Sequence, residues 1–281
     1  MSRSWAELPP PKVAPLGGPG GLRALLRFLL LAVVIYGLMA VLLLLRLGEM
    51  PFRKRVLSPA IVQLACKGAM RIYGLPMRVR GRPMHQRGAI VANHASWLDI
   101  FVLNAAARVF FVSKVEVRTW PLIGNIARAA GTVFIARNPR DAKLQKAQFE
   151  ERLIAGDRLL FFPEGTSTDS RRVVRFKSTL FAAFFTPRLR DKLWIQPASV
   201  IYRAPEGEDS RYYGWWADMT FAPHFLKVLA ARRAGGVEVV FHDPVRVADF
   251  ADRKALAAYC EEKVRAAVEA GLGANGSSKG A

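Results

Sequence analysis

The stretch Ala89–Asp99, which reads AIVANHASWLD, decides how the rest of this chain is interpreted. Its first residues form an apolar run that predicts a buried strand, and the residues after them predict a turn leading into a helix. His94 therefore lies at the end of a strand, and Asp99 follows five residues later. An imidazole held there beside a carboxylate is suited to general base catalysis.

The spacing of His94 and Asp99 limits how the two side chains can meet. In a regular helix, side chains five residues apart point about 140° away from each other. If His94 lies in the turn and Asp99 in the first helical turn, the carboxylate can accept the ring N–H and leave the other ring nitrogen as a free base. The alternative is a structural histidine with a solvated aspartate, which the spacing alone leaves open.

Short apolar runs alternate with helical stretches after Pro76, and this alternation predicts an α/β fold. We expect a mixed, mostly parallel sheet flanked by helices, with the ligand site at the strand ends. The expected strands are residues 77–80, 89–92, 109–112, 132–135, 159–162, 193–202 and 237–241, and the expected helices are residues 98–106, 122–130, 140–155, 176–186 and 253–270.

The N-terminal region predicts a membrane-inserted helical segment. Residues 28–45 carry no charge, and 18 helical residues span about 27 Å, close to the hydrocarbon thickness of a bilayer. Basic residues flank both ends, so the sequence leaves open whether the helix spans the bilayer or enters one leaflet. A second, amphipathic helix is expected at residues 59–73. The expected organisation is a disordered N-terminus (1–21), membrane-anchoring helices (22–73), a catalytic domain (74–270) and a disordered tail (271–281).

The charge balance indicates a polyanionic partner. Lysine and arginine number 42 against 22 acidic residues, so the formal net charge is +20, and 52% of the residues are hydrophobic. Because no nucleic-acid motif accompanies the charge, an anionic membrane surface is the expected partner and nucleic acid is not. Cys66 and Cys260 stand alone and the histidines have no metal-ligand spacing, so neither a disulfide framework nor a metal site is expected.

A second apolar run ends in the turn Pro163-Glu164-Gly165-Thr166. Proline stops the ladder of the strand, and Glu164 is held at the edge of a buried sheet. The turn repeats the arrangement around His94, which suggests that two strand ends converge on one pocket, although a simple polar turn is the alternative. Arg137 follows another expected strand, and its guanidinium could bind a phosphate or a carboxylate. So could a basic cluster, for which a solvated surface is the alternative: Arg171, Arg172, Arg175 and Lys177.

Together these segments resemble the glycerolipid acyltransferases, in particular the lysophosphatidate type, whose motifs are NHxSxxD and FPEGT. Asn93, His94, Ser96 and Asp99 match the first motif, and residues 162–166 match the second. Residues 131–137 and 195–198 look like the two further blocks of the family. The resemblance covers about residues 75–245.

The resemblance implies acyl transfer from acyl-CoA or acyl carrier protein to the hydroxyl of a lysolipid, without a cofactor. His94 would act as the base and Asp99 would orient it. Arg137, Glu164, Gly165, Thr166 and Lys177 would bind the substrate. The family further implies a location at the inner (cytoplasmic) membrane with the catalytic domain facing the cytoplasm. A thioesterase and a non-enzymatic membrane-binding module are the competing functions.

One departure from the family pattern concerns the acceptor. Members acting on lysophosphatidate commonly read FPEGTRS, whereas Ser167 occupies the position of that arginine here. The loss of a bidentate phosphate ligand weakens the case for a phosphomonoester. Lysophosphatidate, as the family default, is the first expectation, and a lyso-aminolipid such as lyso-ornithine lipid, whose head group bears a carboxylate and an amine, is the alternative.

Overall fold

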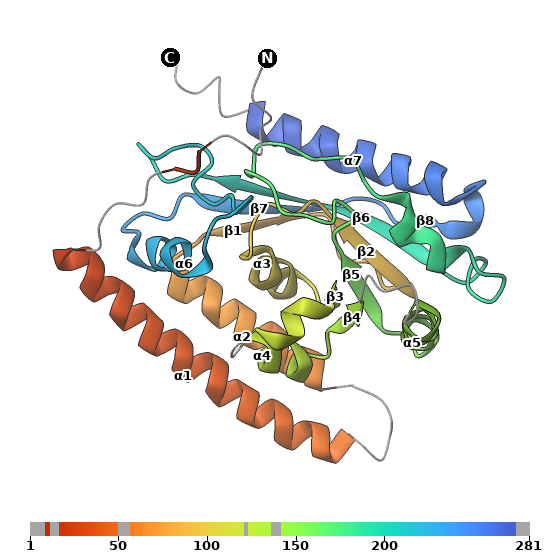
Figure 1. Cartoon of the computed structure of the whole chain (residues 1–281), viewed down its shortest axis with the longest axis horizontal. Helices are drawn as coiled ribbons and strands as arrows, with labels where there is room; N and C mark the ends of the chain where they lie inside the picture. The colour runs from red at the N-terminus through yellow and green to blue at the C-terminus, as the bar shows by residue number, and fades with distance from the viewer. Residues whose placement is uncertain (1–8, 12–16, 50–56, 121–122, 136–141, 274–281) are drawn as a thin grey trace.

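The computed structural model describes residues 9–11, 17–49, 57–120, 123–135 and 142–273. Its centre is a mostly parallel sheet, as the sequence predicts (Figure 1). The strands follow the order β1-β7-β6-β2-β5-β3-β4, and β8 pairs with β6. Their bounds are β1 Met77–Arg80, β2 Gly88–Ala92, β3 Phe110–Lys114, β4 Val133–Ile135, β5 Arg158–Phe161, β6 Trp194–Arg203, β7 Gly236–Phe241 and β8 Val245–Arg246.

Strand direction brings the two sequence motifs to one edge of the sheet. β2 pairs in parallel with both β5 and β6, and Val91 lies opposite Phe161 and Pro197. β5 pairs in parallel with β3, which pairs in parallel with β4, whereas β6 and β7 are antiparallel. The segments that follow β2 and β5 therefore leave the sheet side by side.

Helices cover both faces of the sheet (Figure 1). On one face a core cluster joins the sheet to α1, α2, α3 and α6, and on the other face a second cluster joins it to α7 and the 3₁₀ helix η4. Successive residues of β2 alternate between the two cores, as expected for a strand buried on both sides. The helices are α1 Gly18–Glu49, α2 Ser58–Tyr73, α3 Asp99–Ala106, α4 Ile123–Ala130, α5 Ala142–Ile154, α6 Phe221–Ala230 and α7 Arg253–Gly273, with 3₁₀ helices η3 Val115–Thr119, η4 Ser178–Phe185 and η5 Val247–Asp249.

α1 is long and apolar enough to cross a membrane, and only 11% of its most apolar window is buried. It packs along α2 and α6, with the ring of Phe28 edge-on to that of Phe225. Arg23 and Arg27 donate to the last carbonyls of α6, at 2.7 Å to Ala230 and 3.0 Å to Leu229. Basic side chains commonly satisfy carbonyls at a helix C-terminus in this way. These contacts attach the N-terminal end of α1 to the domain.

Some element boundaries differ from those expected. α1 begins at Gly18, inside the N-terminal stretch expected to be disordered, and α7 continues to Gly273, three residues into the expected tail. Residues 176–186 were expected to form an α-helix, but a 3₁₀ helix occupies 178–185. The 3₁₀ spacing places Phe181 and Phe184 on one face, and both rings contact Phe161. α6 was not predicted, because Pro223 in its first turn interrupts the pattern although a proline is tolerated there.

Gly88 permits the close pairing of β2 with β6. Its φ is +147°, and a Cβ atom there would lie 1.8 Å from the carbonyl oxygen of Trp194. We expect Gly88→Ala to lower the free energy of unfolding by roughly 3 kcal/mol, because backbone strain and a steric clash combine. Gly207, at φ +83° with nothing within 4 Å, isolates the strain alone. Gly207→Ala should therefore cost only about 1 kcal/mol. Denaturant unfolding in detergent, followed by circular dichroism, measures both; equal losses would contradict the steric argument.

Candidate active site

The turn after β2 is held from several sides. Asn93 exchanges two hydrogen bonds with the backbone of Val200 on β6, donating to its carbonyl at 2.9 Å and accepting from its N–H at 2.8 Å. The carbonyl of His94 accepts a hydrogen bond from the N–H of Thr168 at 2.9 Å, and the carbonyl of Ala95 accepts from Trp215 at 3.0 Å. These bonds come from three different parts of the chain, so the turn has a single defined shape.

His94 and Asp99 form the pair that the sequence predicts. The carboxylate Oδ2 of Asp99 lies 2.7 Å from Nδ1 of His94. Asp99 is the first residue of α3 and is fully buried, whereas the His94 side chain is 20% exposed. Within the described part of the chain, Nε2 of His94 makes no hydrogen bond. This geometry excludes the solvated aspartate and leaves one imidazole nitrogen accessible to a reactant.

The Asp99 carboxylate also organises the backbone around it. Oδ2 accepts hydrogen bonds from the N–H groups of Ala95 at 2.8 Å and Ser96 at 3.0 Å. Oδ1 accepts a hydrogen bond from the hydroxyl of Tyr202 at 2.7 Å. Burial, with the nearby Asp99 charge, raises the pKa of Tyr202 well above 10, so its hydroxyl stays protonated and donates. A buried charge of this kind is tolerated because it is fully hydrogen-bonded.

An aromatic side chain packs against one face of the His94 ring. Phe162, the residue after β5, stacks on it with ring centroids 4.0 Å apart and planes 9° from parallel. Since Asp99 restrains the ring in its plane and Phe162 restrains its face, the imidazole has little freedom to rotate.

Glu164 links the two motifs. Its Oε1 accepts a hydrogen bond from the backbone N–H of His94 at 2.7 Å, and its Oε2 accepts from Val174 at 2.8 Å. The side chain is 1% exposed. Burial raises the pKa of Glu164 to about 8, against the lowering effect of the two N–H donors. Both oxygens are thus engaged by the backbone.

Trp97 connects the turn after β2 to α6 by a hydrogen bond and by ring packing. Its Nε1 donates a hydrogen bond to Nδ1 of the buried His224 at 2.9 Å. Burial and the neighbouring Lys227 lower the pKa of His224 to about 3, so His224 is neutral and accepts through this atom. The rings of Phe221 and Phe225 pack edge-on against Trp97.

The other residues predicted to bind substrate are Gly165, Thr166, Lys177 and Arg137. Gly165 has φ +68°, and Nζ of Lys177 lies 2.7 Å from the position that a Cβ atom would take there. Lys177 is exposed, and so is Thr166, whose hydroxyl donates to the carbonyl of Ser167 at 3.3 Å. Arg137 lies outside the described residues.

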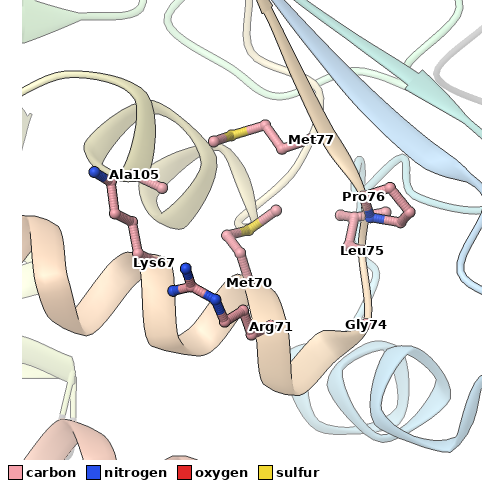
Figure 2. Close-up of a pocket in the computed structure, with 8 residues that line it drawn as sticks. All are labelled: Lys67, Met70, Arg71, Gly74, Leu75, Pro76, Met77 and Ala105. Carbon is pink, nitrogen blue, oxygen red and sulfur yellow. The ribbon is translucent and has the colours of Figure 1, made fainter.

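Two cavities lie on opposite sides of the sheet. One, of about 510 Å³, is lined by α2, the start of β1 and the end of α3, on the same side of the sheet as α1. Figure 2 shows the cationic side chains of Lys67 and Arg71 beside Met70 on α2. The other, of about 520 Å³, lies between η4 and the N-terminal half of α7, and Lys177 is part of its wall.

Sequence reasoning missed the roles of Tyr202, Phe162 and His224. Tyr202 ends the expected strand 193–202. Its contact with Asp99 could be predicted only by knowing that β6 lies beside β2 and extends past the end of β2. Phe162 belongs to the recognised motif, but its stacking depends on the pairing of β5 with β2. His224 lies on α6, which the sequence did not reveal.

A pair of buried tyrosines tests the Tyr202–Asp99 hydrogen bond. We expect Tyr202→Phe to lower the free energy of unfolding by about 1–3 kcal/mol, because it leaves Oδ1 of Asp99 buried without its donor. Tyr73 is equally buried, but its hydroxyl has no hydrogen-bond partner among the described residues. Tyr73→Phe should therefore leave stability unchanged or raise it slightly. Denaturant titrations of the two variants would contradict this interpretation if they gave equal losses.

The raised pKa of Glu164 predicts that the stability of the protein depends on pH. Its pKa rises from 4.5 to about 8 on folding, so between these values the folded protein holds a proton that the unfolded chain has lost. The free energy of unfolding therefore falls as the pH rises through this range. Glu164→Gln removes this contribution, and its slope should differ from that of the wild type by up to ~1.4 kcal/mol per pH unit.

Unfolding titrations of the wild type and Glu164→Gln at several pH values between 5 and 8 measure this difference. Glu262→Gln, which alters an exposed glutamate on α7, is the matched control and should follow the wild-type slope. Parallel curves for the wild type and Glu164→Gln would mean that Glu164 does not change protonation on folding.

Known proteins resemble this chain in sequence and fold. Residues 76–201 match the family model described as Acyltransferase. Lyso-ornithine lipid O-acyltransferase of Rhodobacter capsulatus is 53% identical over 269 residues, which cover 95% of each chain. 1-acyl-sn-glycerol-3-phosphate acyltransferase of Neisseria gonorrhoeae is 30% identical, over 74% of this chain and 80% of the relative.

A solved structure has the same fold. The 1-acyl-sn-glycerophosphate acyltransferase PlsC from Thermotoga maritima superimposes with a TM-score of 0.63 at 22% identity, covering 89% of this chain and 95% of that one. The predicted α/β fold and the predicted family are both confirmed. With its sequence relatives, the paired motifs NHxSxxD and FPEGT and this shared fold, the chain belongs to the glycerolipid acyltransferase family.

Proposed function

We propose that this protein is a lyso-ornithine lipid O-acyltransferase. The observation that carries the proposal is the 53% identity to the Rhodobacter capsulatus enzyme of that name across 95% of both chains. The lysophosphatidate acyltransferase of Neisseria gonorrhoeae is more distant, at 30% identity. These identities favour lyso-ornithine lipid, the alternative acceptor expected from the sequence, over lysophosphatidate, which was the first expectation.

The proposed chemistry uses the free Nε2 of His94. This atom takes the proton of the lysolipid hydroxyl as the oxygen attacks the thioester carbonyl carbon. The new C–O bond forms, the C–S bond breaks, and the imidazolium returns its proton to the leaving thiolate. The products are the diacylated lipid and the free thiol of CoA or acyl carrier protein, so no cofactor is needed.

Asp99 supports both proton transfers. Its 2.7 Å contact with Nδ1 fixes the tautomer that leaves Nε2 unprotonated, and its charge stabilises the imidazolium. General base catalysis of this kind contributes about 10²–10⁴ in rate. Glu164 contributes indirectly in this scheme, because its two backbone hydrogen bonds hold the turn that carries His94.

The acceptor preference has a chemical rationale at residue 167. A serine there offers no bidentate ligand for a phosphomonoester, whereas a head group with a carboxylate and an amine needs none at that position. The guanidinium of Arg137 would then pair with the carboxylate of the acceptor.

We further propose that α1 enters one leaflet of the inner membrane from the cytoplasmic side, where the acyl donors are found. Arg23 contacts α6 and Arg46 donates to the carbonyl of Arg128 on α4 at 3.2 Å, so both ends of the helix touch the same domain. A helix attached at both ends lies along the domain and offers its exposed apolar side chains to the lipid.

A substrate panel tests the acceptor. Purified protein in mixed micelles is incubated with labelled acyl-CoA or acyl carrier protein and with lyso-ornithine lipid, lysophosphatidate or no acceptor. We expect label to enter ornithine lipid well before phosphatidate. Faster acylation of lysophosphatidate would overturn the acceptor, and release of free acid regardless of acceptor would identify a thioesterase.

His94→Ala tests the base in the same assay. We expect acyl transfer to fall by roughly 10²–10⁴-fold, because the hydroxyl proton loses its acceptor. His94→Ala should also lose some stability, because Asp99 loses its contact with Nδ1 and Phe162 loses its stacking partner, and circular dichroism checks that the fold is retained. His85→Ala, at an exposed histidine outside the site, is the control and should retain full activity. An active His94→Ala protein would exclude the proposed mechanism.

A further inference from the structure

The cavity between η4 and α7 carries an excess of positive charge. Arg175, Lys177 and Lys254 line it, together with the hydroxyl-bearing Ser178 and Thr179. Within the described residues, these three cationic side chains make no hydrogen bond or ion pair, and all three are exposed. Unpaired cations around a concave surface attract a polyvalent anion.

The carboxylate in this wall does not neutralise the cations. Both oxygens of Glu261 are already engaged, Oε2 by the backbone N–H of Phe176 at 2.8 Å and Oε1 by Arg265 at 2.7 Å. Arg265 also donates to the carbonyl of Val173. The pair Glu261–Arg265 therefore fixes the chain segment that carries Arg175 and Lys177 against α7, so the cavity has a rigid wall.

The cavity adjoins the candidate active site through the same segment. The N–H of Lys177 donates to the carbonyl of Pro163 at 2.9 Å, and its Nζ lies over Gly165. The N–H of Val174 donates to Glu164, whose other oxygen binds the backbone of His94. A flexible ligand with its anionic end in the cavity can thus extend over residues 163–165 toward His94.

The position of the cavity distinguishes between the two substrates. α7 covers the face of the sheet opposite to the one that carries α1 and α2 (Figure 1). A lipid acceptor delivered by a membrane at α1 arrives on the other face, whereas a water-soluble donor has access to α7. The volume of about 520 Å³ lies within the usual range for small-ligand sites.

We propose that this cavity binds the phosphate group at the end of the phosphopantetheine arm of the acyl donor, a group that acyl-CoA and acyl carrier protein share. This inference rests on the proposed acyl transfer and adds to it the place where the donor docks. The thioester end of the arm then reaches His94 while the phosphate end remains with Arg175, Lys177 and Lys254.

Calorimetric binding of CoA and of holo-acyl carrier protein to the full-length protein in detergent, at low salt, tests the proposal without turnover. We expect the double variant Arg175→Ala/Lys254→Ala to bind the donor roughly tenfold more weakly, since hydrogen bonds to charged groups are lost. Arg188→Ala/Lys192→Ala removes two exposed cations outside the cavity and should bind within twofold of the wild type. Arg175→Gln/Lys254→Gln repeats the test with longer side chains, should the alanine variant unfold.

The two donors identify the source of the phosphate. Weaker binding of both supports the shared arm, and weaker binding of only one supports the cavity as the site of that donor. Unchanged affinity for both overturns the proposal. So does a steady-state result in which the KM of the acceptor rises while that of the donor does not.

Failure of the proposed function is distinguishable from failure of this inference. If the wild type binds CoA through the cavity but acylates no lyso-ornithine lipid, the acceptor assignment fails and the cavity assignment stands. If acyl transfer to lyso-ornithine lipid proceeds and the cavity variant binds donor normally, the reverse holds.

Discussion

The structure around the site depends on the buried carboxylate of Asp99. A charge removed from water must be compensated by hydrogen bonds, and four groups provide them: the N–H groups of Ala95 and Ser96, Nδ1 of His94 and the hydroxyl of Tyr202. Meeting this requirement folds the turn after β2 tightly around the start of α3. The imidazole is oriented as a consequence, with one nitrogen bound and the other available.

Residues of the second motif, FPEGT, add contacts that hold His94 in place. β5 lies beside β2, so Glu164 can accept a hydrogen bond from the backbone of His94, and Phe162 can stack on the His94 ring. Glu164 is too enclosed by its own hydrogen bonds to present a free oxygen to solvent. Glu164 joins the His94 turn to the segment 173–176 through these hydrogen bonds, and so holds both in place.

The sheet separates two environments. On one face, α1 and α2 offer apolar surface and a cavity bordered by Lys67 and Arg71, which suits contact with a lipid bilayer (Figure 2). On the other, η4 and α7 form a cationic cavity that adjoins the turn carrying His94 through the segment of Lys177. In the proposed reaction a lipid and a soluble thioester would approach from these two directions, and the parallel strand ends lie between them.

The sequence by itself determined the strand at 89–92, the turn that carries His94, the helix that carries Asp99 and the family to which the chain belongs. These features are local, because apolar runs, turn residues and short motifs act over a few positions. Only the tertiary structure decided that Tyr202 binds Asp99, that Glu164 is used by the backbone and that Arg175 and Lys254 face one cavity. Those relations join residues up to 103 positions apart, and they follow from strand order and register, which no local pattern encodes.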